Sequence, residues 1–430
     1  MWAIVCRAVG SVWLLSVKRT RARCSGRTMW RVALRSGWGA VRGVGRSGPG
    51  RPGDNAVGRT PVGHILCVTV DAGGNVPPMA RIAAVTARRG HRVTVLGHER
   101  VRRHFDAPGI EFVAYRSVRP WDAGAEQSPL RWVPMLNDRR LGVEVTELCR
   151  ARQPDLALVD CLIAPAHQAV RDLGITRVVL THSIRGWMAD YPRPGRLGGG
   201  SPALLYGYRL GDLWDSAALN LVAAHRGTDP ARDRERSENV RWTGAVLPPA
   251  RPADIAGRSP HVVVSMSTNG YPGQRAVLNR VIAALTPMRV RATVTTGGVF
   301  DPVSFDAPDH IEVTGFADHG DLMPTTSALI GHGGYSTTMR ALSHDIPVVV
   351  IPASAFTDQP IVGRAMRDAG VGRLVRRSGS PSSIRSAAEA VLTDESIRGR
   401  ARELGAQLRT QDGAAVAASA LEELLTGPVT

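Results

Sequence analysis

The stretch "GHGGYSTTMRALSHDIPVVVIP", residues 331–352, places a glycine turn and a run of hydroxyls between two apolar segments. Residues 327–330 lead into it as a short apolar run, and residues 347–351 are rich in β-branched side chains. Both segments have the composition of buried strands. Residues 335–342 are compatible with a helix, so the order strand, turn, helix, strand predicts a parallel βαβ unit.

The turn itself indicates a site for an anion. Gly333 and Gly334 allow a sharp bend close to a bound group, and a helix start presents unpaired N–H donors at the positive end of its dipole. A phosphate is the natural occupant. The alternative is that the glycines only make a turn and the hydroxyls only cap a helix. His332, beside the glycines, favours the phosphate.

The same plan occurs twice along the chain. A proline-opened helix over residues 77–89 follows the first predicted strand, and a Pro-rich linker over residues 248–260 separates the two halves. Predicted strands lie at 64–70, 92–97, 155–160 and 177–182, and again at 261–267, 291–297 and 310–316. This alternation predicts an α/β protein of two doubly wound domains, 61–247 and 261–430, which face a central cleft at the carboxyl ends of their strands.

The charge is concentrated in a leader. Residues 1–60 hold twelve Lys or Arg and one acid, so they carry +11 of the net +17 and leave +6 for the other 370 residues. We therefore expect no nucleic-acid binding by the domains. We expect the leader either to be disordered or to be absent from the true protein because the start codon has been assigned too far upstream. A basic arm that touches a membrane surface peripherally is the alternative.

The cysteines indicate neither disulfides nor a metal site. The sequence contains no CxxC pair, and Cys67 and Cys161 lie in apolar, strand-like runs. Free buried thiols are typical of a reducing compartment, so a cytoplasmic protein is expected.

Three segments in order carry a resemblance to a known family. Neither glycine turn matches G-x-G-x-x-G or a P-loop. Instead "GHGGYSTTMRAL", "DIPVVVIP" and "TDQP" resemble the nucleotide-sugar signature of family 1 glycosyltransferases, which have the GT-B fold and include actinobacterial enzymes that decorate antibiotics and lipids. The resemblance extends from His64 to about Leu425. It implies an inverting hexosyltransferase that moves a sugar from a UDP- or dTDP-sugar to a hydroxyl of a hydrophobic small molecule or lipid.

The resemblance also implies which residues bind the donor. His332 would contact the α-phosphate. The other implied donor contacts are Gly333, Gly334, Ser336 and Thr337 at the β-phosphate, Ser267 and Thr268 at the pyrophosphate, Asp358 and Gln359 at the sugar hydroxyls, and Phe316 at the base. For Phe316 a place in the core is an equal alternative. Fixed donors aimed at a leaving diphosphate stabilise the transition state, so neither a metal nor another cofactor is required.

The amino half departs from the family pattern at the general base. In "DAGGNVPPMA" the position that is His, or sometimes Asp, in many members falls on Asn75, and an amide cannot take a proton usefully. Asp71 from a shifted position, or Asp160 or His182 directly or through water, would have to replace it. Each also has a structural alternative: a turn cap for Asp71, an Asx turn for Asp160, a hydrogen-bonded strand end for His182. The other reading is a catalytically silent GT-B protein that binds nucleotide sugars or assists a partner transferase.

The acceptor is expected to be flat or hydrophobic, because aromatic residues gather between residues 119 and 208. These rings are Trp121, Trp132, Trp187, Tyr191, Tyr206 and Tyr208. Core or loop-anchoring roles are the alternative.

Overall fold

The computed structural model describes residues 62–125, 131–189 and 201–426. The predicted leader, residues 1–60, lies outside the described residues, as does Tyr191. Within the described parts of the chain, no helix is both long enough and apolar enough to cross a membrane.

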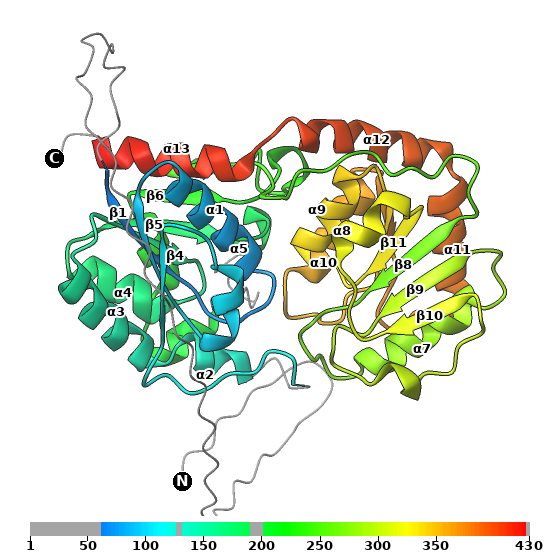
Figure 1. Ribbon diagram of the computed structural model, residues 1–430, viewed down its shortest axis with the longest axis horizontal. Coiled ribbons are helices and arrows are strands. Elements are labelled where there is room, and N and C mark those ends of the chain that lie inside the picture. The colour runs from blue at the N-terminus through cyan, green and yellow to red at the C-terminus, as the bar shows by residue number, and fades with distance from the viewer. Residues whose placement is uncertain (1–61, 126–130, 190–200, 427–430) are drawn as a thin grey trace, which may run out of the picture. The chain divides into compact units, whose positions relative to one another are not determined.

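The first half is built on a seven-stranded parallel sheet (Figure 1). Its strands are β1 (His64–Val68), β2 (Arg92–Gly97), β3 (Ile110–Ala114), β4 (Leu156–Asp160), β5 (Thr176–Thr181), β6 (Leu219–Val222) and β7 (Val240–Trp242). Their order in space is β3-β2-β1-β4-β5-β6-β7. The order reverses at β1 and β4, which is the switch point at which α/β sheets bind ligands.

Helices cover both faces of this sheet, so its strands are apolar on both sides. In β1, Ile65 and Cys67 enter one hydrophobic core, whereas Leu66 and Val68 enter another. This is the period of two expected of a strand that is buried on both faces. The helices are α1 (Val76–Arg88), α2 (Trp132–Leu136), α3 (Arg139–Arg152), α4 (Ala164–Asp172), α5 (Arg185–Ala189) and α6 (Leu210–Asp215).

The second half repeats the design with a six-stranded parallel sheet. Its strands are β8 (His261–Ser265), β9 (Arg291–Thr295), β10 (Ile311–Thr314), β11 (Ala328–Gly331), β12 (Val348–Val350) and β13 (Gly372–Leu374), in the spatial order β10-β9-β8-β11-β12-β13. The helices are α7 (Gln274–Leu285), α8 (His319–Leu322), α9 (Tyr335–Ser343), α10 (Gln359–Asp368), α11 (Pro381–Thr393) and α12 (Glu395–Arg409). The βαβ unit predicted from residues 331–352 is therefore β11, α9 and β12, and β11 pairs in parallel with β12.

The last helix departs from the predicted division of the chain. Helix α13 (Gly413–Thr426) packs on α1 of the first half, with Ala417 and Leu421 in the same core as Ile65 (Figure 1). A stripe of buried alanines needs an apolar partner, and the first sheet supplies it. The range 261–430 assigned to the second domain is thus wrong for this helix. The predicted linker, 248–260, contains neither helix nor strand.

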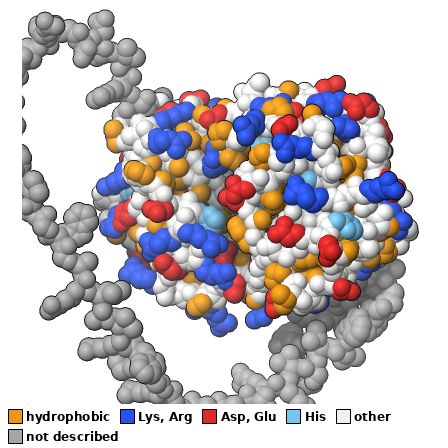
Figure 2. Space-filling view, turned by 45° about the vertical axis from the view of Figure 1, so that its right-hand side comes forward, with side chains coloured by type: hydrophobic (Ala, Val, Ile, Leu, Met, Phe, Trp, Pro, Cys, Tyr) orange, Lys and Arg blue, Asp and Glu red, His pale blue; other side chains and the backbone are white. Residues whose placement is uncertain are grey.

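The charges of the described residues are mixed. On the face in Figure 2, basic and acidic side chains are interspersed with apolar ones.

Candidate active site

A cavity of about 980 Å³ lies at the carboxyl ends of strands from both halves. Its walls include segments that directly follow β1, β5, β8, β9, β10 and β11. The cavity therefore occupies the cleft that was predicted from the two doubly wound halves. All ten predicted donor residues except Gly333 line it: Ser267, Thr268, Phe316, His332, Gly334, Ser336, Thr337, Asp358 and Gln359.

Helix α9 presents an open amino terminus to this cavity. Its N-cap is Gly334, and no side chain caps it. Ser336 and Thr337 in the first turn line the cavity, and no hydrogen bond of their hydroxyls occurs among the described residues. The alternative in which these hydroxyls only cap the helix is therefore wrong, and the unpaired N–H groups remain available to an anion.

Packing, as well as backbone geometry, requires the two glycines of this turn. Gly333 has φ +89°, and a Cβ there would lie 2.8 Å from Val350 Cγ1 and 3.0 Å from the carbonyl oxygen of Gln359. At Gly334 a Cβ would lie 2.6 Å from His332 Nε2. The imidazole of His332 thus lies directly over the turn because Gly334 has no side chain.

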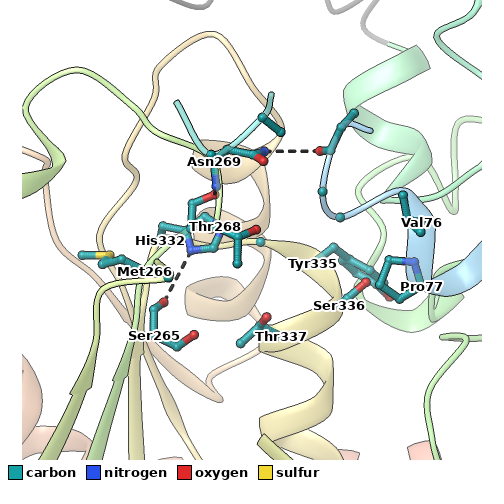
Figure 3. A pocket seen from close by; sticks show the side chains of 18 of the residues that line it. Val76, Pro77, Ser265, Met266, Thr268, Asn269, His332, Tyr335, Ser336 and Thr337 are labelled. Atoms are coloured by element: carbon teal, nitrogen blue, oxygen red, sulfur yellow. Dashed lines mark hydrogen bonds between the residues drawn. The ribbon is translucent and has the colours of Figure 1, made fainter. Parts of the chain in front are cut away.

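Burial keeps the imidazole of His332 neutral. Burial lowers its pKa to about 4, and its Nδ1 lies 3.5 Å from the carbonyl oxygen of Ser265 (Figure 3). In the same view Ser336 and Thr337 lie on the first turn of α9, and Val76 and Pro77 lie on the segment opposite.

Two basic residues that sequence reasoning missed also line the cavity. His319 Nε2 lies 3.0 Å from Ser265 Oγ, and burial lowers the pKa of His319 to about 4. Arg340 is about one turn along α9 from Thr337, and its nearest ion-pair partner, Asp318, is 3.6 Å away. Arg340 could have been found, because residues three apart share a helix face. His319 had no comparable signal.

The loop after β8 is held from both sides. Ser267 Oγ accepts a hydrogen bond from the backbone N–H of Asn269 at 3.0 Å. Asn269 Nδ2 in turn donates to the carbonyl oxygen of Ala72, 3.2 Å away in the first half (Figure 3). Phe316 is 73% exposed, so its alternative placement in the core is wrong, and its ring stands at the cavity wall.

Asp358 and Gln359 begin α10 and have different local partners. Ser183 Oγ of the first half donates to Asp358 Oδ2 at 2.5 Å, and burial raises the pKa of Asp358. Gln359 Oε1 accepts from the backbone N–H groups of Ala353 and Ser354 at 2.8 and 3.0 Å. The side-chain oxygen of Gln359 therefore stabilises the loop that leads into α10.

Asn75 does not line the cavity. Its side chain is buried, and Nδ2 donates to Thr69 Oγ1 at 3.1 Å and to the carbonyl oxygen of Val70 at 3.0 Å. A hydrogen bond from Asn75 also contributes to the low pKa of Asp160. Asn75 is thus a hydrogen-bonding residue behind the cavity wall.

Asp160 and His182 form a pair at the ends of neighbouring strands. His182 Nδ1 lies 2.9 Å from Asp160 Oδ2, and Asp160 Oδ1 accepts from the backbone N–H of Leu162 at 3.0 Å. Asp160 therefore makes the Asx turn considered above and holds His182 as well. Asp160 is buried, whereas the His182 side chain is 13% exposed and lines the cavity.

Asp71 lines the cavity elsewhere on the first half. Its carboxylate lies 3.8 Å from Arg100 Nε, and Arg100 also pairs with Asp122. Burial raises the pKa of Asp71 in spite of Arg100.

The aromatic rings expected at the acceptor are placed mostly in cores. Trp121 and Trp132 pack edge to face at 5.4 Å against one core, and Trp187 and Tyr208 pack against others. None of the described members of that group lines the cavity. The prediction that they form the acceptor surface is wrong, because indole and phenol rings serve equally well as packing groups.

One group of side chains has donor atoms close enough together for a metal ion, among the parts of the chain that the structure describes. It consists of Asp160, Cys161 and His182. Burial and the negative charge of Asp160 raise the pKa of Cys161, so its sulfur is a neutral thiol.

Comparison with known proteins agrees with this geometry. Residues 292–424 match the family described as "Erythromycin biosynthesis protein CIII-like, C-terminal domain". The NDP-glycosyltransferase YjiC of Bacillus licheniformis is 22% identical over 394 residues, which cover 84% of this chain and 98% of that protein. The glycosyltransferase of kitacinnamycin superposes with a TM-score of 0.71 at 21% identity, over 85% of this chain and 99% of that one. The chain is a glycosyltransferase with the GT-B fold.

A shorter part of this glycosyltransferase matches another relative at higher identity. The demethyllactenocin mycarosyltransferase of Streptomyces fradiae is 31% identical over 180 residues, which span 41% of this chain and 37% of the relative. Sugar transfer of the natural-product type is thus the activity that the family supports.

Proposed function

We propose that this glycosyltransferase moves a sugar from a UDP- or dTDP-sugar to a hydroxyl of a hydrophobic acceptor, with inversion and without a metal or another cofactor. The observation that carries the proposal is the open amino terminus of α9. Among the described residues, the hydroxyls of Ser336 and Thr337 have no hydrogen-bond partner, and His332 lies over the same turn.

This arrangement suits a diphosphate leaving group. As the glycosidic bond breaks, negative charge grows on the diphosphate, and fixed N–H donors stabilise it more in the transition state than in the ground state. Arg340 adds a positive charge on the same wall of the cavity. These groups perform the role that a divalent cation has in other transferases.

The placement of the donor residues supports inversion. The donor residues belong to the second half, and the facing wall of the cavity belongs to the first. An acceptor held on the facing wall attacks the anomeric carbon opposite the leaving group, and one such displacement inverts the configuration.

The facing wall supports a hydrophobic acceptor, although not through the aromatic rings expected. Val76, Pro77, Val101 and Ala123 line it. Charged and polar side chains, Arg100, Arg103 and His104 among them, lie beside these apolar ones, so the wall offers apolar contact together with hydrogen-bonding groups for an acceptor.

Calorimetric titration of the full chain and of His332→Ala with UDP and with dTDP tests the donor site. We expect one of the two nucleotides to bind, and the variant to bind it about 10- to 100-fold more weakly, since a hydrogen bond to a charged group is lost. Equal affinity of variant and wild type would contradict the assignment of the turn. Binding without release of nucleoside diphosphate from any donor and acceptor would favour the silent GT-B protein.

A further inference from the structure

We propose that His182 is the general base of the transfer and that Asp160 positions it, in place of a base at residue 75. The proposal rests on the proposed function and adds the group that takes the acceptor proton.

The sheet brings the two side chains together. Asp160 is the last residue of β4, His182 directly follows β5, and the two strands pair in parallel with Asp160 opposite Leu180. The 2.9 Å contact joins His182 Nδ1 to Asp160 Oδ2, and Leu162 fixes the other carboxylate oxygen. The same nitrogen also lies 3.7 Å from Cys161 Sγ, so Nδ1 is turned toward Asp160 and Cys161. Nε2 has no hydrogen bond among the described residues, and its lone pair is the one that can accept a proton.

The donor half places a sugar-binding candidate next to this imidazole. Ser183, the residue after His182, donates to Asp358 at 2.5 Å, and the charge of Asp358 interacts with His182. His182 also lines the cavity that holds the open helix terminus. An acceptor hydroxyl beside His182 is therefore close to the end of the cavity where the reacting carbon is expected.

The other candidates have partners that occupy them. The side-chain Nδ2 of Asn75 donates to Thr69 Oγ1 and to the carbonyl oxygen of Val70, behind the cavity wall. Asp160 is 1% exposed and cannot meet an acceptor directly. The carboxylate of Asp71 faces the guanidinium of Arg100 at 3.8 Å, and Arg100 is therefore its partner although burial leaves the pKa of Asp71 raised.

The step balances without another reactant. The acceptor hydroxyl oxygen forms a bond to the anomeric carbon as its proton passes to His182 Nε2. The bond from that carbon to the phosphate oxygen breaks, and its electron pair leaves on the diphosphate. Asp160 remains ionised and stabilises the imidazolium that forms.

The charges around His182 set the pH at which it acts. Burial disfavours the imidazolium, but the carboxylate of Asp160 outweighs burial and raises the pKa of His182 well above its usual value. Cys161 and Asp358 are the other titratable groups that face it. The base is active only when neutral, so the transfer rate rises with pH through this raised pKa.

The test compares two phenols as acceptors in His182→Gln and wild type, with UDP-glucose and dTDP-glucose as donors. Phenol is largely un-ionised near pH 8, as tyrosine is, and needs a base, whereas the more acidic 4-nitrophenol is largely ionised and does not. We expect His182→Gln to lower glucoside formation from phenol by about 100- to 10,000-fold. Formation from 4-nitrophenol should fall much less, and UDP or dTDP affinity should stay that of wild type.

Two controls keep the result decisive. His310→Gln makes the same change outside the cavity lining and should react as wild type does. Asp160→Asn removes the negative partner, so the acid limb of the pH–rate profile should move to lower pH as the plateau falls.

Three results would overturn the base assignment. The first is wild-type transfer to phenol by His182→Gln, the second an equal loss with both phenols, and the third an unmoved profile in Asp160→Asn. If wild type binds nucleotide but forms no glucoside from either phenol, and releases no diphosphate into water, the proposed function fails and the base assignment fails with it.

Discussion

The two glycine turns of this transferase lie at equivalent ends of the two sheets and serve opposite purposes. After β11, "GHGG" opens onto a helix whose first-turn hydroxyls have no hydrogen-bond partner in the described parts of the chain. After β1, "DAGGN" opens onto a helix whose start is filled by the protein itself. There the N–H of Val76 donates to the carbonyl oxygen of Gly73 at 3.2 Å, and prolines 77 and 78 have no N–H to offer.

The difference shows how a helix terminus becomes or ceases to be an anion site. Its dipole is common to both helices, so the dipole alone does not decide. What decides is whether donors remain unpaired at a cavity. The second half keeps them unpaired, whereas the first turn of α1 has none left, because Val76 donates to Gly73 and the next two residues are prolines. The Asn75 side chain is itself bonded to Thr69 and Val70, so in this proposal proton transfer falls to the ends of β4 and β5.

The largest expected effect comes from breaking the open turn. Gly333→Ala places a Cβ at φ +89° against Val350 and the carbonyl of Gln359. We expect a loss of about 2 to 5 kcal/mol in the free energy of unfolding, from strain and overpacking, with loss of nucleotide binding. Urea denaturation measures the first and calorimetry the second.

The other turn supplies the matched control. Gly74→Ala adds a Cβ that meets no atom within 4 Å, and its φ is not in the left-handed region. Its free energy of unfolding should stay within about 0.5 kcal/mol of wild type. Equal destabilisation at both glycines would mean that the two turns do not differ in the way described.

A smaller effect is expected in the pH dependence of nucleotide binding. Burial holds His332 neutral with a pKa of about 4, and a diphosphate bound beside it would raise that pKa because it favours the imidazolium. The affinity that His332 contributes is therefore largest at low pH and declines as the pH rises through the bound-state pKa.

Titration of wild type and His332→Ala from about pH 5 to 8 measures this contribution, because ionisation of the nucleotide itself cancels between them. The ratio of the two affinities should fall by about tenfold, which is 1.4 kcal/mol. A constant ratio would show that His332 binds as a neutral donor or does not touch the phosphate.

Asn75→His sharpens the comparison from the first half. Since His182 already has Asp160 as its partner, a second imidazole at residue 75 should not raise the rate of transfer to phenol by more than about threefold. It also removes the hydrogen bonds to Thr69 and Val70, which costs about 1 kcal/mol of stability for each bond. A large gain in rate would indicate that the wild type lacks a working base.

Much of the fold was predictable because its signals are local. Alternating strands and helices, the turn at 331–334 and the linker all follow from residues close together in the sequence. The element against which α13 packs was not predictable, because a stripe of alanines indicates that a helix face is buried but not which element covers it. Its contact with α1 joins residues more than 300 positions apart.

The candidate site likewise has a part that a local motif predicted and a part that depends on contacts distant in sequence. His332 and the hydroxyls of α9 stand in one motif and were identified together. Asp160 and His182 were each suspected as strand-end residues, but their pairing depends on β4 and β5 being neighbours in the sheet. The aromatic rings between residues 119 and 208 did not predict the acceptor surface, because the sequence does not distinguish a ring that packs in a core from one that contacts an acceptor.

Removal of metal ions is expected to have the smallest effect. The diphosphate would meet its charge at the α9 terminus, His332 and Arg340, all on the second half. Among the described residues, the one group spaced for a metal ion, Asp160, Cys161 and His182, lies on the first half and contains a neutral thiol, which suits Mg²⁺ poorly. Excess EDTA should therefore leave glucosylation of phenol unchanged. A loss that Mg²⁺ restores would show that a cation neutralises the diphosphate, and the open turn would then be only part of the donor site.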